Sequence, residues 1–436
     1  MEANTTLQEL IVSSHPVSSA AAAAFARALA ANTTLRSLDL GNRSFGDEAL
    51  AALAPGIAAS FSLRHLNLEA KGLSAAGCAS LAAAMAARSG GGGGGLHELL
   101  LGQNSLGGAG LAALLEGCGG ACSSVRLLDL TACGLEGADG VQPLAAALKQ
   151  GALPSLRVLR VDGNELGAEG AAALAPSLGS SGAARLQQLH MQRCSLGPQG
   201  AASLTAALPG GLAVLDMGGN ALSCQGGAAL AAALAAGAAP QLSSLLLCAC
   251  GLEDGSIAAL AEALGNRGSA EGTEQDAGAA APGLALDLSR NAAGAAAVAA
   301  LATAPLSALC LHDCKLGGGG QGSSGAAGSL APAAPAQQLA TPGTFSLLQE
   351  LDVSGNKLEA AELLPLLEAL TATAATGTGE DNSRPCPCLR LLVIAANPGA
   401  AEEAVTAAIE RLQGVRPGLD VVRRAADTGE GGLMQC

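Results

Sequence analysis

The apolar residues of this chain recur in a fixed frame, L-x-x-L-x-L, which begins at Leu7, Leu35 and Leu63, at steps of 28 residues. The same four residues, Ala-Asn-Thr-Thr, precede both Leu7 and Leu35. A recurrence at this period indicates one supersecondary unit stacked about thirteen times, which is a solenoid and not a globule around one central core. Further copies begin at Leu96, Val125, Leu156, Leu186, Leu212, Leu242, Leu306, Leu348 and Leu389, and in one weaker copy Gly283 replaces the first leucine.

Each copy predicts one strand and one helix. The L-x-L portion alternates with a period of two, as a short strand with one buried face does. Between the frames lie alanine-rich stretches such as 79–87 and 228–236, which have high helix propensity. Leu230 and Leu234 are one helical turn apart and therefore share a face, which we expect to pack on the sheet. The predicted fold class is α/β, with a parallel β-sheet on the concave face and α-helices on the convex face.

The ninth frame position alternates between asparagine and cysteine over nine repeats. An inward-pointing asparagine can hydrogen-bond to backbone groups of adjacent turns, and a buried cysteine fills the same space as a small apolar group. We therefore expect a structural ladder along the solenoid. Its members are Asn104, Cys133, Asn164, Cys194, Asn220, Cys250, Asn291, Cys314 and Asn356.

With this alternation, the full frame L-x-x-L-x-L-x-x-N/C-x-L resembles the leucine-rich repeat. In particular it resembles the ribonuclease-inhibitor-like subfamily, which also occurs in NOD-like receptor proteins and Ran GTPase-activating proteins. The resemblance implies a horseshoe-shaped leucine-rich repeat solenoid. It covers residues 1–414, and we expect residues 415–436 to form a partly disordered C-terminal cap or tail. Low-complexity insertions interrupt the array at 88–95, 265–282, 317–344 and 371–387.

Composition and charge narrow the expected partners. The formal net charge is −14, and aromatic residues make up 1% of the chain. Nucleic acid is not expected as a partner, because neutralising phosphates requires clustered Lys and Arg. A protein with a basic surface fits the charge better. Neither a signal peptide nor a membrane span is recognisable, so the sequence predicts an intracellular, cytoplasmic protein without membrane contact and with reduced thiols among its 13 Cys.

No catalytic or metal-binding constellation is expected, and no cofactor. The run Gly90–Gly95 lacks the Lys-Ser/Thr of a phosphate-binding loop. In Cys310-x-His312-x-Cys314, the third residue holds the inward ladder position while the other two are expected on the concave face, so the three cannot converge on one ion.

The fifth frame position is expected to face solvent on the concave side, where aspartate is frequent. Neighbouring repeats are roughly 5 Å apart, so these residues would form a shallow acidic stripe. Aspartate there can simply keep the strands soluble, or the stripe can dock basic side chains of a partner. The candidate partner-binding residues are Asp39, Asn67, Asp129, Arg160, His190, Asp216, Asp287 and Asp352.

These observations favour a non-catalytic protein–protein interaction scaffold. One alternative, which the family resemblance implies, is a GTPase-activating protein for a Ran-like small GTPase, for which Arg36 and Arg64 are the candidate polar residues near the N-terminus. Another is a structural subunit of a ciliary or cytoskeletal assembly, suggested by the Ala/Gly-rich, loop-expanded composition.

Overall fold

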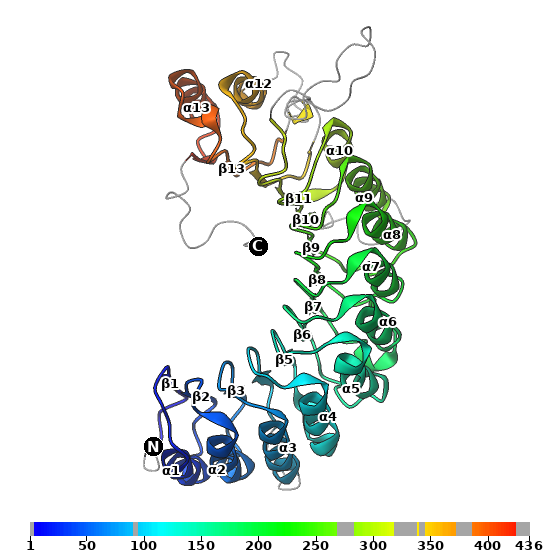
Figure 1. The fold of residues 1–436 in the computed structure, drawn as a ribbon. Helices are drawn as coiled ribbons and strands as arrows, with labels where there is room; N and C mark the ends of the chain where they lie inside the picture. The colour runs from blue at the N-terminus through cyan, green and yellow to red at the C-terminus, as the bar shows by residue number, and fades with distance from the viewer. Residues whose placement is uncertain are drawn as a thin grey trace, which may run out of the picture. The chain divides into compact units, whose positions relative to one another are not determined.

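The computed structural model describes residues 4–89, 95–267, 283–317, 338–339, 345–371 and 386–423. The chain divides into two compact units, Met1–Asp216 and Met217–Cys436. Both are built from the same strand–helix repeat (Figure 1).

In the N-terminal unit, eight strands pair in parallel and in chain order. Their helices lie on one side of the sheet (Figure 1), and the other side is called the open face below. The strands are β1 (Glu9–Ser13), β2 (Ser37–Gly41), β3 (His65–Asn67), β4 (Glu98–Leu100), β5 (Leu127–Asp129), β6 (Val158–Arg160), β7 (Gln188–His190) and β8 (Val214–Asp216). The helices are α1 (Ser19–Ala31), α2 (Gly46–Ala59), α3 (Ala75–Ser89), α4 (Gly107–Gly117), α5 (Gly137–Lys149), α6 (Gly167–Leu178) and α7 (Gly197–Thr205), with 3-10 turns η1 (Gly119–Ser124) and η2 (Ser181–Ala183).

The C-terminal unit repeats this plan with six described strands that also pair in parallel. They are β9 (Ser244–Leu246), β10 (Leu284–Asp287), β11 (Leu306–Cys310), β12 (Glu350–Asp352), β13 (Leu391–Val393) and β14 (Asp420–Val422). The helices are α8 (Ser223–Ala235), α9 (Asp254–Arg267), α10 (Ala295–Leu301), α12 (Ala360–Thr371) and α13 (Glu403–Val415), with the 3-10 turn η4 (Pro398–Ala401). Strand β14 pairs with β13, so the sheet continues past residue 414.

The strand register places equivalent frame positions side by side. Leu38 pairs with Leu66, and Leu66 pairs with Leu99, so the middle leucine of each frame stacks on the next. These leucines are at most 1% exposed. The helices approach closely because their contact positions are small: a Cβ at Gly56 of α2 would lie 2.4 Å from the Ala26 backbone of α1.

The predicted solenoid is confirmed: each frame gives a strand, the alanine-rich stretches are helices, and the described elements fit about 13 repeats. The predicted insertions fall largely outside the described residues. Their edges are described, where α3, α9 and α12 end at Ser89, Arg267 and Thr371, and so are residues 338–339, of which Leu339 is completely buried.

The ladder asparagines bridge consecutive turns. Asn164, which is 1% exposed, donates its side-chain N–H groups to the carbonyls of Leu130 and Val161 at 2.8 and 2.7 Å. Its Oδ1 accepts the backbone N–H groups of Cys133 and Leu135, both at 3.0 Å. Asn104, Asn291 and Asn356 make the same four-part arrangement with the repeats before them.

The alternation follows from two kinds of turn. After Cys133, the turn N–H groups are accepted by the asparagine side chain of the next repeat. After Asn104, the N–H groups of Leu106 and Gly107 are instead accepted by the carbonyl of Cys133. Where a backbone carbonyl accepts the turn N–H groups, no side-chain acceptor is needed, and a cysteine can occupy the ninth position. The thiol of Cys133 donates to the carbonyl of Leu101 at 3.3 Å. Cys194, Asn220, Cys250 and Cys314 are also completely buried.

Candidate interaction surface on the N-terminal unit

The carboxylates at the fifth frame position have a local structural role. Asp129 Oδ1 accepts the backbone N–H of Thr131 at 2.9 Å, two residues further along. Asn67, Asp287 and Asp352 each accept the corresponding N–H at 2.7–2.8 Å. This is an Asx turn, which Asp and Asn form readily. It supplies a backbone reason for Asp at this position, in addition to solubility or partner binding.

Several of the acidic side chains are also paired within the chain. The Lys71 ammonium lies 2.7 Å from Asp39 and donates to the Gly41 carbonyl at 2.9 Å. Lys71 occupies the ninth, inward position of its repeat and is 4% exposed. The sequence did not predict its ion pair with Asp39. Asn67 also donates to Asp39, at 3.2 Å. The Asp39 carboxylate is thus held by two side chains and is not available as an isolated charge.

The second group of candidate residues lies on adjacent strands. Asp129 pairs in register with Arg160, and the two side chains approach to 4.0 Å. His190 lies 3.6 Å from Asp216, which also accepts from Gln192 at 2.6 Å. Of these residues, Arg160 is exposed, Asp129 and His190 are half-buried, and Asp216 is buried. The carboxylates on this part of the open face thus have partners within the chain.

The expectation that the fifth position faces solvent is wrong for the last members of the row. Asp216 is 4% exposed, Asp287 is 0% exposed and Asp352 is 8% exposed. Cys310, expected on the same face, is 4% exposed and bonds to Ser289 at 3.0 Å. Accessible polar residues of the predicted row are therefore confined to the repeats before Asp216.

The open face of the N-terminal unit contains a groove of about 540 Å³ across β1 to β4. Its most exposed apolar side chain is Ile11, at 60%. His65 and Glu98 form an ion pair at 2.8 Å, and both side chains are more than 40% exposed. Of the predicted candidates, only Asp39 and Asn67 line this groove. The lining residues are Gln8, Glu9, Ile11, Arg36, Ser37, Asp39, His65, Leu66, Asn67, Glu98 and Leu100.

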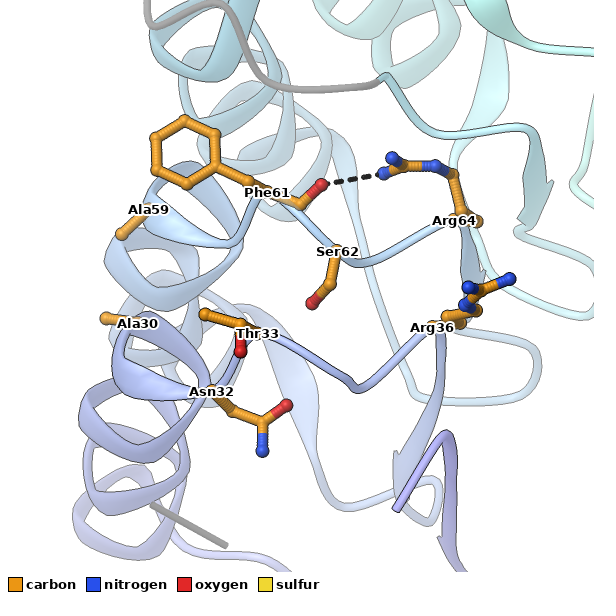
Figure 2. A pocket seen from close by; sticks show the side chains of 8 residues that line it. All are labelled: Ala30, Asn32, Thr33, Arg36, Ala59, Phe61, Ser62 and Arg64. Atoms are coloured by element: carbon orange, nitrogen blue, oxygen red, sulfur yellow. Dashed lines mark hydrogen bonds between the residues drawn. The ribbon is translucent and has the colours of Figure 1, made fainter. Parts of the chain in front are cut away.

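Beside the sheet, a second hollow of about 400 Å³ lies where the loops from α1 and α2 enter β2 and β3 (Figure 2). Phe61 lines it and is 55% exposed. Arg64 turns its guanidinium back to donate to the carbonyls of Phe61 and Leu63, both at 2.9 Å. Beneath this loop, the buried Arg88 of α3 donates to the carbonyls of Ile57 and Leu63, and burial lowers its pKa to about 10. The hollow therefore combines an exposed aromatic ring with a cationic rim.

The cysteines show no arrangement suited to metal binding in the part of the chain that the structure describes. Cys314 donates to the Leu288 carbonyl at 3.1 Å, whereas His312 bonds to Ser354 at 2.8 Å on the other side of the backbone. Burial raises the pKa of Cys314 to about 12. A hydrogen bond from Cys122 lowers the pKa of Cys118, yet both thiols are at most 2% exposed.

None of the described helices has both the length and the apolar character needed to cross a membrane.

Comparisons with known proteins bear on the family. A protein-family model described as "Leucine Rich repeat" matches residues 31–54 and 152–175. The search of curated proteins found no match.

Similar solved structures include the complex of Rad7 and Elc1 in yeast, with 15% identity, a TM-score of 0.40, and coverage of 95% of this chain and 90% of that chain. The TLR13–ssRNA13 complex has 16% identity and a TM-score of 0.47, and covers 97% of this chain and 55% of that one. An internalin, InlF, from Listeria monocytogenes has 13% identity and a TM-score of 0.41, with 96% and 87% coverage. The family match at two repeats, the repeated frame and the strand–helix unit together support a leucine-rich repeat architecture for this chain.

Proposed function

We propose that this protein is a non-catalytic interaction scaffold that binds another protein through the open face of β1 to β4. The observation that carries the proposal is the groove of about 540 Å³ on that face, which is bordered by the exposed side chain of Ile11. A rigid repeat sheet presents such a surface at little conformational cost, which favours binding.

The groove's lining indicates the chemistry of the partner. Ile11 and Leu100 offer apolar contact, and Glu9 and Glu98 place carboxylates on either side of it. Glu9 is exposed, and Glu98 is 42% exposed at its side chain. A partner segment with one apolar side chain and a nearby Lys or Arg would match this arrangement. Of the predicted acidic stripe, Asp39 and Asn67 belong to the proposed binding groove. Asp129, Arg160 and His190 lie on β5, β6 and β7, beyond the groove.

Comparative affinity capture tests this proposal. The variant Ile11→Asp/Glu9→Lys changes two exposed side chains of β1. Its matched control, Val415→Asp/Glu403→Lys, makes the same two changes on α13, where Val415 is 39% exposed. We expect proteins captured by wild type and control to be missing with the β1 variant, while circular dichroism stays the same for all three. Identical captured sets would contradict the proposal.

Within the described residues, no side-chain arrangement favours a GTPase-activating protein or a cytoskeletal subunit over a general interaction scaffold. The same capture distinguishes them, since a small GTPase or a cytoskeletal protein among the β1-dependent partners would identify one or the other.

A further inference from the structure

One column of the repeat is basic over consecutive rungs of the N-terminal unit. The second frame position is occupied by Arg36, Arg64, His97, Arg126 and Arg157. These residues are direct neighbours, because each donates its backbone N–H to the carbonyl of the preceding one: Arg64 to Arg36, His97 to Arg64, Arg126 to His97 and Arg157 to Arg126, at 2.7–2.8 Å. We call these five residues the basic row. Glutamine stands at both ends, as Gln8 before it and Gln187 after it.

The side chains of the basic row are accessible and carry little compensating charge. Arg36, Arg126 and Arg157 are exposed, and Arg64 and His97 are half-buried. Within the described residues, no carboxylate forms an ion pair with Arg36, Arg126 or Arg157. Partial burial lowers the pKa of His97, and the neighbouring cations Arg126 and Arg64 lower it further, whereas Glu98 raises it. Four arginines in an acidic chain thus form a local concentration of positive charge.

The N-terminal end of the basic row opens into the hollow beside α1 and α2. Arg36 and Arg64 line that hollow together with Phe61 (Figure 2). Ala30 and Ala59 form its apolar wall, and Thr33 and Ser62 supply hydroxyl groups. An exposed aromatic ring is a typical anchor in protein interfaces. Figure 2 shows the ring of Phe61 beside Ala59, on the opposite side of the hollow from the guanidinium groups of Arg36 and Arg64.

We propose that the basic row binds a short acidic segment of a partner protein, with an apolar side chain of that segment seated against Phe61. Arginine suits this role because its planar guanidinium binds carboxylates in a two-pronged fashion. Five rungs span about 19 Å at the interstrand spacing, which an extended peptide of about six residues matches. The basic row runs along the N-terminal ends of β2 to β6, since each of its residues directly precedes a strand. It shares Arg36 with the groove on the open face.

An acidic peptide fits this surface better than a nucleic acid does. The chain's net charge of −14 opposes a long polyanion, whereas a segment with a few carboxylates needs only the local row. Proteins that bind single strands also use several aromatic side chains as stacking platforms, and the hollow contains Phe61 alone among its lining residues.

Fluorescence anisotropy of the full-length chain with a labelled acidic peptide tests the proposal. The probe has about eight residues, Glu and Asp around one central Leu. The variant Arg36→Gln/Arg126→Gln/Arg157→Gln removes the exposed arginines of the basic row. The control Arg27→Gln/Arg193→Gln/Arg411→Gln removes three exposed arginines elsewhere and changes the net charge equally.

We expect saturable binding that weakens with added salt, a Kd at least tenfold higher for the row variant, and a Kd within twofold of wild type for the control. A peptide with Gln in place of every acidic residue should not bind. The proposal is overturned if the acidic peptide does not bind, if both triple variants weaken it equally, or if a single-stranded oligothymidylate binds in its place with the same dependence on the row. A groove variant, Ile11→Asp/Glu9→Lys, should leave peptide binding intact and so separates this result from the proposed function.

Discussion

Replacing Asn164 with Leu would test whether the ladder holds the N-terminal unit together. The asparagine is 1% exposed and makes four short hydrogen bonds to backbone groups of two consecutive repeats. Leucine has a similar length but neither donates nor accepts. The change therefore leaves the N–H groups of Cys133 and Leu135 without their acceptor and the carbonyls of Leu130 and Val161 without the Asn164 donor.

The size of the loss follows from these four groups. An unsatisfied buried donor costs about 1–3 kcal/mol, so the two N–H groups together cost about 2–6 kcal/mol. The carbonyls add less, because each has a second lone pair. Against this, the leucine gains some apolar burial. We expect the free energy of unfolding to fall by about 4 kcal/mol, a large share of the 5–15 kcal/mol typical of a domain.

Urea denaturation followed by helical circular dichroism measures this loss. The comparison is Cys133→Ala, one repeat earlier, which removes a thiol that donates to Leu101 at 3.3 Å and leaves the backbone pairing in place. That variant should lose only about 1 kcal/mol. If Asn164→Leu and Cys133→Ala cost the same within error, the four-bond account of the asparagine is wrong.

Three further changes test other contacts. Lys71→Met should lower the free energy of unfolding by about 3 kcal/mol, because it leaves the largely buried carboxylate of Asp39 without its cation, and adding Asp39→Asn should restore part of it in urea denaturation. Burial raises the pKa of Asp162, although the carboxylate accepts the backbone N–H of Gln192. The folded protein therefore binds a proton at Asp162 more tightly than the unfolded chain does, and the free energy of unfolding falls as pH rises through the raised pKa. Asp162→Asn should thus gain Tm relative to wild type at pH 7 and not at pH 3; an equal difference at both would contradict this. Ala249 has φ 52°, so Ala249→Gly should raise the unfolding free energy by up to about 1 kcal/mol, and a loss would show that strain there is negligible.

The repeat frame was enough to predict the solenoid because burial and register follow from the same period. The L-x-L alternation requires a strand with one buried face, and the step of about 28 residues leaves room for one helix per repeat. The inward position of Asn164 and Cys133 follows in the same way, since the ninth residue leaves the strand on the side of the core.

The behaviour of the individual charges did not follow from the frame. The interpretation of the fifth position as a solvent-facing stripe considered each aspartate separately, whereas Asp39 is held by a lysine from a later repeat and Asp287 is completely buried. Such contacts depend on which side chain the neighbouring rung supplies. Lys71 stands where the repeats from Asn104 onward have Asn or Cys, and this departure from the frame is the signal in the sequence that points to the pair.

Net charge is a coarse guide to the surfaces of this chain, because it averages over positions that the fold separates. In a stacked array, residues at one frame position become neighbours at about 5 Å, well within the screening length of about 8–10 Å at physiological salt. Four arginines in one column therefore concentrate positive charge locally, in a chain that has 36 acidic residues in total. The sequence contained this information in the second frame position, from Arg36 to Arg157. The proposed acidic partner therefore rests on this column of arginines and not on the total charge of −14.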